Sequence, residues 1–391
     1  MRYSIATFLC VASINVHANV LQYFTGLSYS NPAELFKVKK NDFIIGGTVM
    51  YADIDFKGRQ FNFNTSDYDV GSSDSKQTSL LPYGRIANRL NDKLVFGVDV
   101  TEPFHSNLKW GPNAVTRYAS TETLMTDIDV SPRASVSLSQ SVYIGGGLNF
   151  NFLKNNEANW ALPSGETTYN TLINRSYGFG LGADIGLYYM FNKTNFFGAA
   201  YYSSIKQKAR GESLFGLNIN TNHKFYFRMP ATTILSYTHL FSKDWLINLL
   251  AYRSEWNANQ IARVRDTAAP PPTPKDFAFN MKYDVSWAFV GLVRHQISEK
   301  TGLALISAYD DGPEQPQYRP LNFPSDKQYL LGFVADYKAT ATTSLQLLYA
   351  HVISNTIIGN RTNFRGNSIP FTTGRVQINA DVVDLRLLVQ V

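Results

Sequence analysis

The chain has 391 residues, of which 44% are hydrophobic, 14% aromatic and 17% charged, and its formal net charge is +6 at pH 7. So many aromatic residues and so few charges exclude intrinsic disorder. Beyond the N-terminus no apolar run reaches the roughly 18 residues that a membrane helix needs, which excludes a helical membrane protein. The basic residues are scattered, which argues against a nucleic-acid partner. Two classes remain, a large soluble β protein and a transmembrane β-barrel.

The first segment is typical of a secretory signal peptide. Arg2 provides a short positive region, residues 5–14 are mostly apolar, and Ala18 is a small residue suited to cleavage. We therefore expect residues 1–18 to be removed. Cys10 is the only cysteine and lies in this segment, so the mature chain would contain no disulfide and no thiolate ligand for a metal.

Residues 19–42 are too apolar for a free tail, and we expect them to fold into the lumen of a barrel as a hatch, or plug. The predicted rigid part of this hatch is Asn31-Pro32-Ala33. Proline fixes its own φ and lacks an N–H, asparagine can cap backbone groups, and a small alanine permits close approach to the wall. An ordinary turn before the first strand is the alternative.

Beyond the hatch the sequence alternates with a period of two. The third predicted strand places Phe96 and Val100 on one face and Gly97 and Asp99 on the other, and then meets Pro103. The same alternation, rich in aromatic residues, continues through 178–191, 224–231, 277–289 and 329–336. Alternation over about ten residues predicts membrane-spanning strands, whereas soluble sandwiches have shorter ones. Because proline cannot donate to a ladder, we expect Pro103 to interrupt the third strand.

Six short polar connections alternate with seven longer ones. The short turns are centred on residues 91–92, 139–140, 192–193, 243–244, 299–300 and 340–341; the longer loops are expected near 59–76, 107–120, 156–175, 209–222, 257–276, 310–326 and 356–373. Thirteen connections join fourteen antiparallel strands, with the barrel occupying residues 43–391. Short turns face the periplasm in barrels of the bacterial outer membrane. The predicted fold is therefore an all-β, 14-stranded antiparallel transmembrane β-barrel in the outer membrane of a Gram-negative bacterium, surrounded by membrane lipid and lipopolysaccharide.

Four short stretches together resemble one family. They are Asn31-Pro32-Ala33, the glycine-rich run 178–189, Tyr309-Asp310-Asp311-Gly312-Pro313 and residues 322–326. In this order and spacing they resemble the long-chain fatty acid transporter (FadL-type) family of outer-membrane proteins, which includes transporters of aromatic hydrocarbons. The resemblance implies a monomeric barrel closed by an N-terminal hatch and an internal hydrophobic pocket. It also implies a kinked third strand that opens the wall laterally, here around Gly97, Asp99 and Pro103.

The resemblance implies passive uptake of a long-chain fatty acid or another hydrophobic small molecule. A cation for the head group would have to face the lumen, and strict alternation places Lys224, Arg228 and Lys282 there. The family's basic residue near the end of the fifth strand corresponds to Lys154, which alternation turns outward instead. A structural ladder of ion pairs that stiffens the wall would explain the lumen-facing charges equally well.

Two other functions compete with transport. An outer-membrane lipid-modifying hydrolase would need a Ser or Asp beside a His, and only Asp310-Asp311 with His351 suggests one. Paired acids in a turn are commonly turn formers. A general water-filled porin would have a densely charged, unobstructed lumen, whereas this sequence predicts a hatch and many inward glycines. We expect no catalytic residues, no cofactor and no bound metal.

Overall fold

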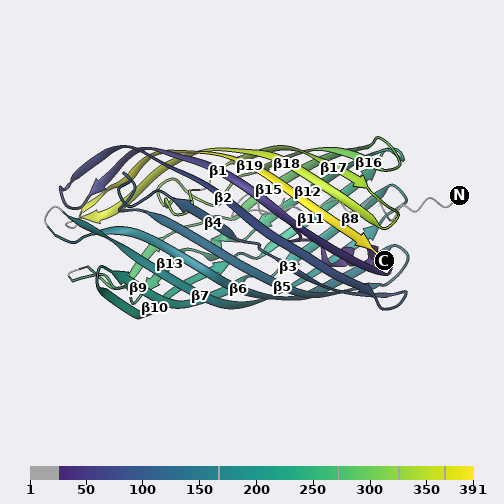
Figure 1. The fold of residues 1–391 in the computed structure, drawn as a ribbon, viewed down its shortest axis with the longest axis horizontal. Helices are drawn as coiled ribbons and strands as arrows, with labels where there is room; N and C mark the ends of the chain where they lie inside the picture. Colours follow the sequence, from purple (N-terminus) through teal and green to yellow (C-terminus); the bar gives the residue numbers. More distant parts are fainter. Residues whose placement is uncertain (1–25, 166–167, 272, 325, 365–366) are drawn as a thin grey trace.

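The sheet closes on itself to form a barrel (Figure 1). The computed structural model describes residues 26–165, 168–271, 273–324, 326–364 and 367–391; the predicted signal peptide and the first part of the predicted hatch, 19–25, lie outside the described residues. The closing ladder joins β1 (Asn41–Asn62) to β19 (Asn367–Gln390). Within the described ranges, no helix is long and apolar enough to cross a membrane.

Fourteen antiparallel wall strands are built from nineteen strand segments in the described part of the chain. Five wall strands consist of two segments separated by a break, namely β3 with β4, β8 with β9, β10 with β11, β12 with β13, and β14 with β15. The segments between β1 and β19 are β2 (Asp67–Arg89), β3 (Leu94–Thr101), β4 (His105–Lys109), β5 (Glu122–Ser137), β6 (Val142–Pro163), β7 (Tyr169–Met190), β8 (Asn195–Tyr202), β9 (Ile205–Phe215), β10 (Asn218–Met229), β11 (Thr232–Leu240), β12 (Trp245–Ser254), β13 (Ile261–Arg265), β14 (Phe277–Asn280), β15 (Ser286–Gln296), β16 (Thr301–Asp310), β17 (Gln328–Lys338) and β18 (Thr343–Phe364).

All six predicted short turns are confirmed, and they lie at the end of the barrel that holds the C-terminus (Figure 1). Four of the seven predicted long loops are wrong. Residues 59–76, 156–175, 209–222 and 356–373 belong mostly to long strands, so that β1 and β2 are joined by the short turn 63–66 and β9 and β10 by Gly216-Leu217. The prediction failed because these strand ends are polar on both faces. A polar stretch without hydrophobic alternation has the same composition as a loop. The described residues of 110–121, 266–271, 273–276, 311–324 and 326–327 are irregular instead.

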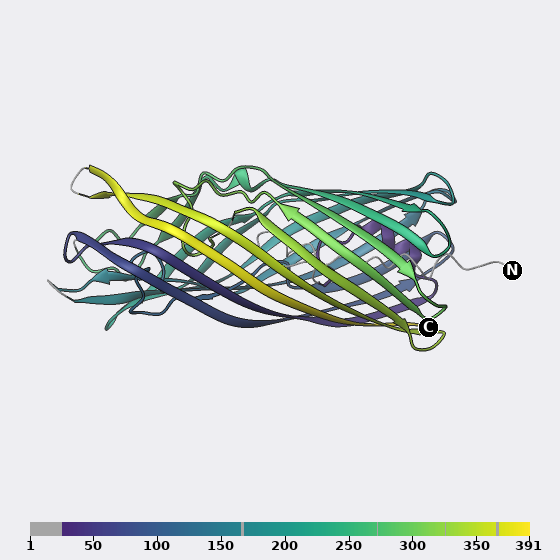
Figure 2. The same ribbon diagram turned by 90° about the horizontal axis from the view of Figure 1, so that it is seen from above.

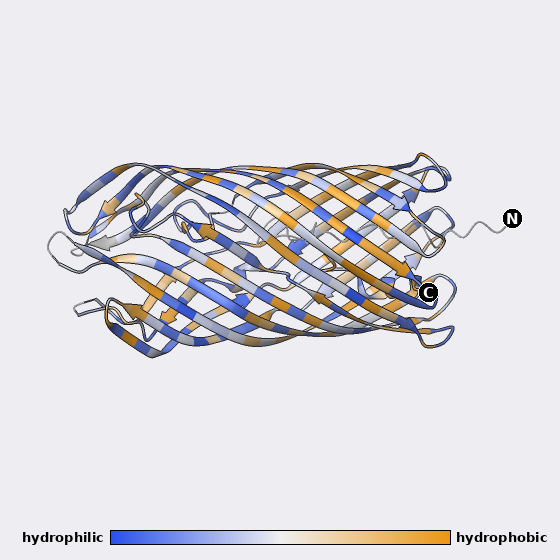
Figure 3. Ribbon diagram, viewed as in Figure 1, coloured by the Kyte–Doolittle hydropathy of each residue, from blue (hydrophilic) through white to orange (hydrophobic). Residues whose placement is uncertain are grey.

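The predicted orientation of side chains is right for most of the wall and inverted in one part. Apolar side chains point outward along β7 and β17, where Phe179, Leu181 and Leu331 are more than half exposed, and such residues alternate with polar ones along the strands (Figure 3). In β10 the phase is opposite to the prediction, because Phe225 and Met229 are buried in the lumen. A one-residue shift exchanges the two faces of a strand.

Breaks in four neighbouring wall strands cause this inversion. They fall at 203–204, at 230–231, at 255–260 around the short helix η4 (Trp256–Ala258), and at 281–285. The segments β8, β11, β12 and β15 pair with one another on the periplasmic side of the breaks, and β9, β10, β13 and β14 pair on the outer side. Pro230 stands at one break, and Lys282 has a φ of 49° at another. The inward-facing parity therefore changes across the β8–β9 and β10–β11 breaks, whereas β12 and β13 keep the same parity.

Single cysteines test which end of the barrel faces outward. The described chain contains no cysteine, so Leu217→Cys, at the fully exposed β9–β10 turn, should react with a membrane-impermeant maleimide on intact cells. Asn192→Cys, in an exposed short turn at the opposite end, should react only after the outer membrane is permeabilised. The unsubstituted protein provides the background. Labelling of Asn192→Cys alone on intact cells would reverse the topology.

Candidate ligand pathway

The N-terminal segment, residues 26–40, crosses the lumen. The carbonyl of Gly26 accepts a hydrogen bond from Arg386 Nη2 of β19 at 2.8 Å, and Asn31 Nδ2 donates to the carbonyl of Leu187 in β7, also at 2.8 Å. These two strands lie on nearly opposite sides of the wall. Asn31 Oδ1 also accepts from the N–H of Ala33 at 3.0 Å and so caps the 3₁₀ helix η3 (Pro32–Lys37). Figure 2 shows this purple segment within the ring of strands.

Inward glycines make room for Asn31-Pro32-Ala33. A Cβ on Gly186 of β7 would lie 2.1 Å from Asn31 Oδ1, and one on Gly145 of β6 would lie 2.5 Å from the nitrogen of Ala33. Glycine in a strand often marks such a close approach of another backbone. Ser135 Oγ of β5 completes the contact by donating to the carbonyl of Ala33 at 2.9 Å. Part of the glycine-rich run of β7 therefore forms the surface against which the N-terminal segment packs.

A compensated charge cluster holds the same segment at Ser30. Arg133, only 3% exposed, pairs with Asp99 at 2.5 Å and with Asp184 at 3.0 Å, and Arg85 pairs with Asp99 at 2.5 Å. Ser30 Oγ accepts from Arg85 at 3.0 Å and from Arg133 at 3.1 Å. Buried charges are tolerated only when they are paired in this way. The predicted lateral-gate residue Asp99 is thus part of the anchor of the N-terminal segment.

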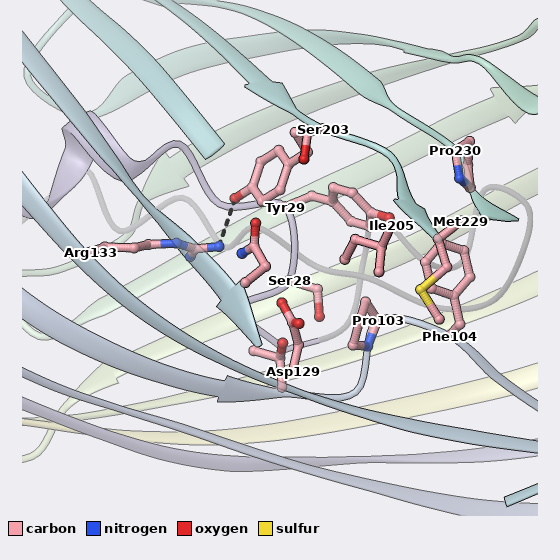
Figure 4. A pocket seen from close by; sticks show the side chains of 13 residues that line it. Ser28, Tyr29, Pro103, Phe104, Asp129, Arg133, Ser203, Ile205, Met229 and Pro230 are labelled. Atoms are coloured by element: carbon pink, nitrogen blue, oxygen red, sulfur yellow. Dashed lines mark hydrogen bonds between the residues drawn. The ribbon is translucent and has the colours of Figure 1, made fainter. Parts of the chain in front are cut away.

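A small cavity lies beside this cluster (Figure 4). It is lined by Tyr29 of the N-terminal segment, by Pro103 in the third wall strand, and by residues at two further breaks. Ser203 and Ile205 flank the β8–β9 break, and Met229 and Pro230 adjoin the β10–β11 break. Arg133, joined to Tyr202 by a hydrogen bond of 3.1 Å, forms its polar side. The irregular points of the wall therefore meet at one place inside the barrel.

The third wall strand is interrupted at Pro103 and bends into the lumen there. β3 pairs with β2 as far as Val100 opposite Gly84, and β4 pairs with β5, but across the described chain no ladder joins β4 to β2. Instead, the buried hydroxyl of Ser79 in β2 bonds to His105 Nε2 at 2.7 Å, and that of Ser75 accepts from the N–H of Lys109 at 2.8 Å. Since these serines face inward, β4 lies under β2 rather than beside it.

Gly97, the other predicted lateral-gate residue, lies below the interruption. A Cβ at this position would lie 3.1 Å from the Cβ of Ala87 and 3.4 Å from Leu35 Cδ2 of the N-terminal segment. Gly97 therefore packs mainly against β2 and, unlike Gly145 and Gly186, leaves only ordinary contact with the N-terminal segment. Of the three predicted residues, Pro103 alone lines the cavity.

A chain of aromatic rings runs from the cavity toward the outer end of the barrel. Tyr29 contacts Phe104 with ring centroids 6.4 Å apart, Phe104 contacts Trp256 at 6.0 Å, Trp256 contacts Phe227 at 6.3 Å, and Phe227 contacts Phe225 at 6.2 Å. Phe225 and Phe227 were expected on the lipid side and are instead inside, because the phase of β10 is inverted. One strip of the outer half of the lumen is consequently apolar.

Two irregular segments fold inward at the outer end. Trp110 Nε1, in the segment 110–121, donates to the carbonyl of Leu321, in the segment 311–327, at 3.2 Å. Arg319, 1% exposed, pairs with Asp326 at 3.0 Å and with Glu314 at 3.4 Å. Residues of the segments 110–121 and 314–321 therefore contribute to a covering over the outer end of the lumen.

The four cations predicted to hold a head group lie on the outer face of the wall. Lys224 pairs with Asp266 at 2.8 Å with both side chains over a third exposed, and Arg228 shares its face of β10. Lys282 and Lys154 are exposed. The lumen-facing prediction for Lys224, Arg228 and Lys282 is wrong because it assumed uninterrupted alternation. The outward orientation predicted for Lys154 agrees with the structure.

Sequence reasoning missed Arg133, the cation that does line the cavity. A signal was present, because Asp127, Asp129, Ser131, Arg133 and Ser135 form a polar face of β5 in strict alternation. Such a run predicts an inward polar face, although the partners of each side chain depend on strands far away in the sequence.

Displacing the N-terminal segment should open the lumen. Gly186→Val would force a side chain into Asn31, so we expect higher single-channel conductance in a planar bilayer than that of the unsubstituted barrel. Gly291→Val is the matched control, because a Cβ there meets only Leu249 Cδ2, at 3.8 Å. Equal conductance of the two folded variants would contradict a segment that obstructs the lumen.

Comparison with known proteins agrees with this architecture. The model of the family described as outer membrane protein transport protein (OMPP1/FadL/TodX) matches residues 24–387. A Pseudomonas aeruginosa FadL homologue has a similar structure with a TM-score of 0.82 at 14% identity, over 93% of each chain. The toluene transporter TodX of P. putida gives a TM-score of 0.70 at 14% identity, covering 94% of this chain and 95% of its own.

A third similar structure, the toluene transporter TbuX of Ralstonia pickettii, gives a TM-score of 0.64 at 13% identity, over 93% of each chain. No curated protein matches the sequence. At such low identities the structural similarity establishes the fold alone. The family model, in contrast, matches nearly the whole chain and therefore establishes the family. The chain therefore belongs to the FadL/TodX family of outer-membrane transport proteins for hydrophobic compounds.

Proposed function

We propose that this protein carries a hydrophobic small molecule passively across the outer membrane and releases it sideways through the wall at Pro103. The main support for this proposal is that the aromatic chain, the cavity and the interrupted third strand lie at one place. An apolar ligand gains about 0.8 kcal/mol for each CH₂ removed from water, so an apolar lumen attracts it without energy input.

The proposed path begins among the aromatic rings of the outer lumen and passes Trp256 and Phe104. It reaches the cavity beside Tyr29, where the N-terminal segment blocks the way to the periplasm. The open side is then the gap between β2 and β4. An unpaired strand edge facing lipid is costly, so the inward bend of β4 and its bonds to Ser75 and Ser79 favour a functional role for this gap.

In this proposal Asn31, Pro32 and Ala33 form the fixed part of a hatch. Support comes from their seats on Gly145 and Gly186 and from the anchoring of Ser30 by Arg133. A hatch held by so many contacts keeps the lumen closed to water-soluble solutes while the lateral path stays usable, which separates this function from that of a general porin.

The lining favours an uncharged hydrocarbon over a long-chain fatty acid. Arg133, the cation of the cavity lining, already pairs with Asp99 and Asp184, and Asp129 lines the same cavity, so a ligand carboxylate would add to an already acidic surrounding. The relatives named as toluene transporters, TodX and TbuX, are consistent with such a ligand. Fatty acids remain the alternative within the same proposal, since their acyl chains suit the same apolar path.

Filling the cavity should block transport. Ile205→Trp places a large ring where Ile205, 8% exposed, lines the cavity, and we expect at least a tenfold fall in the rate of labelled toluene or oleate uptake by cells. Leu235→Trp, on the exposed face of β11, is the matched control and should transport normally. Unimpaired uptake by a folded Ile205→Trp barrel, verified by its heat-modifiable migration, would exclude this path.

A pair of ligands with the same ring system, one neutral and one carrying a carboxylate, separates the two ligand classes. Naphthalene should bind the purified barrel at least tenfold more tightly than 2-naphthoate, because the carboxylate meets the acidic side of the Arg133 cluster. Quenching of tryptophan fluorescence measures both affinities. Tighter binding of 2-naphthoate would favour the fatty-acid alternative and leave the path itself intact.

A further inference from the structure

The outer face of the barrel carries a compact grid of cations. It consists of seven side chains on three neighbouring segments, Lys206, Lys208 and Arg210 of β9, Lys224 and Arg228 of β10, and Arg263 and Arg265 of β13. They alternate with buried residues such as Gln207, Phe225 and Val264, so the cations share one outward face. We call this set the outer basic grid.

Strand pairing brings these cations directly opposite one another. Lys224 stands opposite Arg210 on one side and opposite Arg265 on the other, and Arg228 stands opposite Lys206. Like charges in facing positions of a sheet repel. Among the described residues, Asp266 alone forms an ion pair with the grid, at 2.8 Å from Lys224. The grid therefore carries a large uncompensated positive charge, which bound anions would stabilise.

The neighbouring strand fixes the height of the grid relative to the membrane. Arg210 stands opposite Tyr177 of β7, which is 68% exposed, and the next outward residues along β7 are Phe179 and Leu181 at 52% and 54%. An aromatic residue followed by exposed apolar ones is typical of the edge of the lipid-facing band. Arg210 thus lies at the outer edge of the lipid-facing band. Lys208 and Lys206 precede it in β9 and lie in successive rows toward the periplasmic side, from which long basic side chains can reach back to the head groups.

We propose that the outer basic grid binds the phosphate groups of lipopolysaccharide in the outer leaflet. The phosphorylated glucosamines of its lipid part are the anions at this depth of a Gram-negative outer membrane, and Arg and Lys are the side chains that bind phosphate best.

Tyr226 lies in the centre of the grid, between Lys208 and Arg263, with Arg265 over its ring at 5.6 Å. Lys154 extends the grid onto β6, from an exposed position in the bulge near Tyr177. This surface is separate from the transport path, so its role does not depend on the proposed function.

The test compares two triple variants of the whole barrel. Lys208→Gln/Lys224→Gln/Arg265→Gln removes the middle of the grid, and Lys93→Gln/Lys193→Gln/Lys300→Gln removes three exposed cations from the short turns at the periplasmic end. Native mass spectrometry and a detergent-phase titration measure the binding of bis-phosphorylated lipid A, of its dephosphorylated form and of inorganic phosphate.

We expect the unsubstituted barrel to prefer bis-phosphorylated over dephosphorylated lipid A by at least tenfold. The grid variant should lose this preference, whereas the turn variant should keep it, and both should fold because all six positions are solvent- or lipid-facing. The proposal is overturned if the two variants bind lipid A equally or if the unsubstituted barrel shows no preference for the phosphorylated form. It is also overturned if millimolar inorganic phosphate competes as effectively as lipid A itself. Uptake of labelled toluene by the grid variant should be unchanged, which separates this result from any failure of the transport path.

Discussion

Every backbone N–H and carbonyl that faces lipid must find its hydrogen-bond partner within the wall, and this constraint governs the whole structure. The ladder between β1 and β19 satisfies it by closing the sheet. Breaks are tolerated only where side chains replace the missing bonds. Asp127 Oδ1 accepts from the N–H of Phe104 at 2.6 Å, and Asn259 bonds to both backbone groups of Arg228.

Local patterns were sufficient to predict the architecture. Alternation and turn residues gave fourteen strands and all six short turns, because strand period and turn chemistry are written in adjacent residues. The outer hairpins were mistaken for loops because, beyond the lipid, neither face of a strand needs to be apolar. The long polar ends of β1 and β2 show this, with exposed side chains such as Lys57 and Asp74. The hydrophobic period disappears where the membrane ends, although the hydrogen-bonded ladder continues.

The sequence alone could not predict which side chains face the lumen or which partners they meet there. Whether Lys224 or Phe225 faces the lumen depends on how the chain passes Pro230, and a shift of one residue there exchanged the two faces. The cluster around Arg133 depends on four strands whose pairing is set by the whole sheet. The outer basic grid was equally hidden: its members are two or four residues apart along each strand and become neighbours only across strands. A net charge of +6 gave no hint of such a concentration.

The anchoring of the N-terminal segment also dictates an order of assembly. Gly26 is bound by Arg386, 360 positions later in the chain, and Asn31 by Leu187, 156 positions later. The residues that leave the ribosome early thus depend on a strand that is made last. Contacts so distant in sequence form slowly. Since Arg386 lies in the strand that seals the wall against β1, seating of the segment is complete only once the cylinder has closed, and until then the segment depends on its contacts with the earlier strands alone.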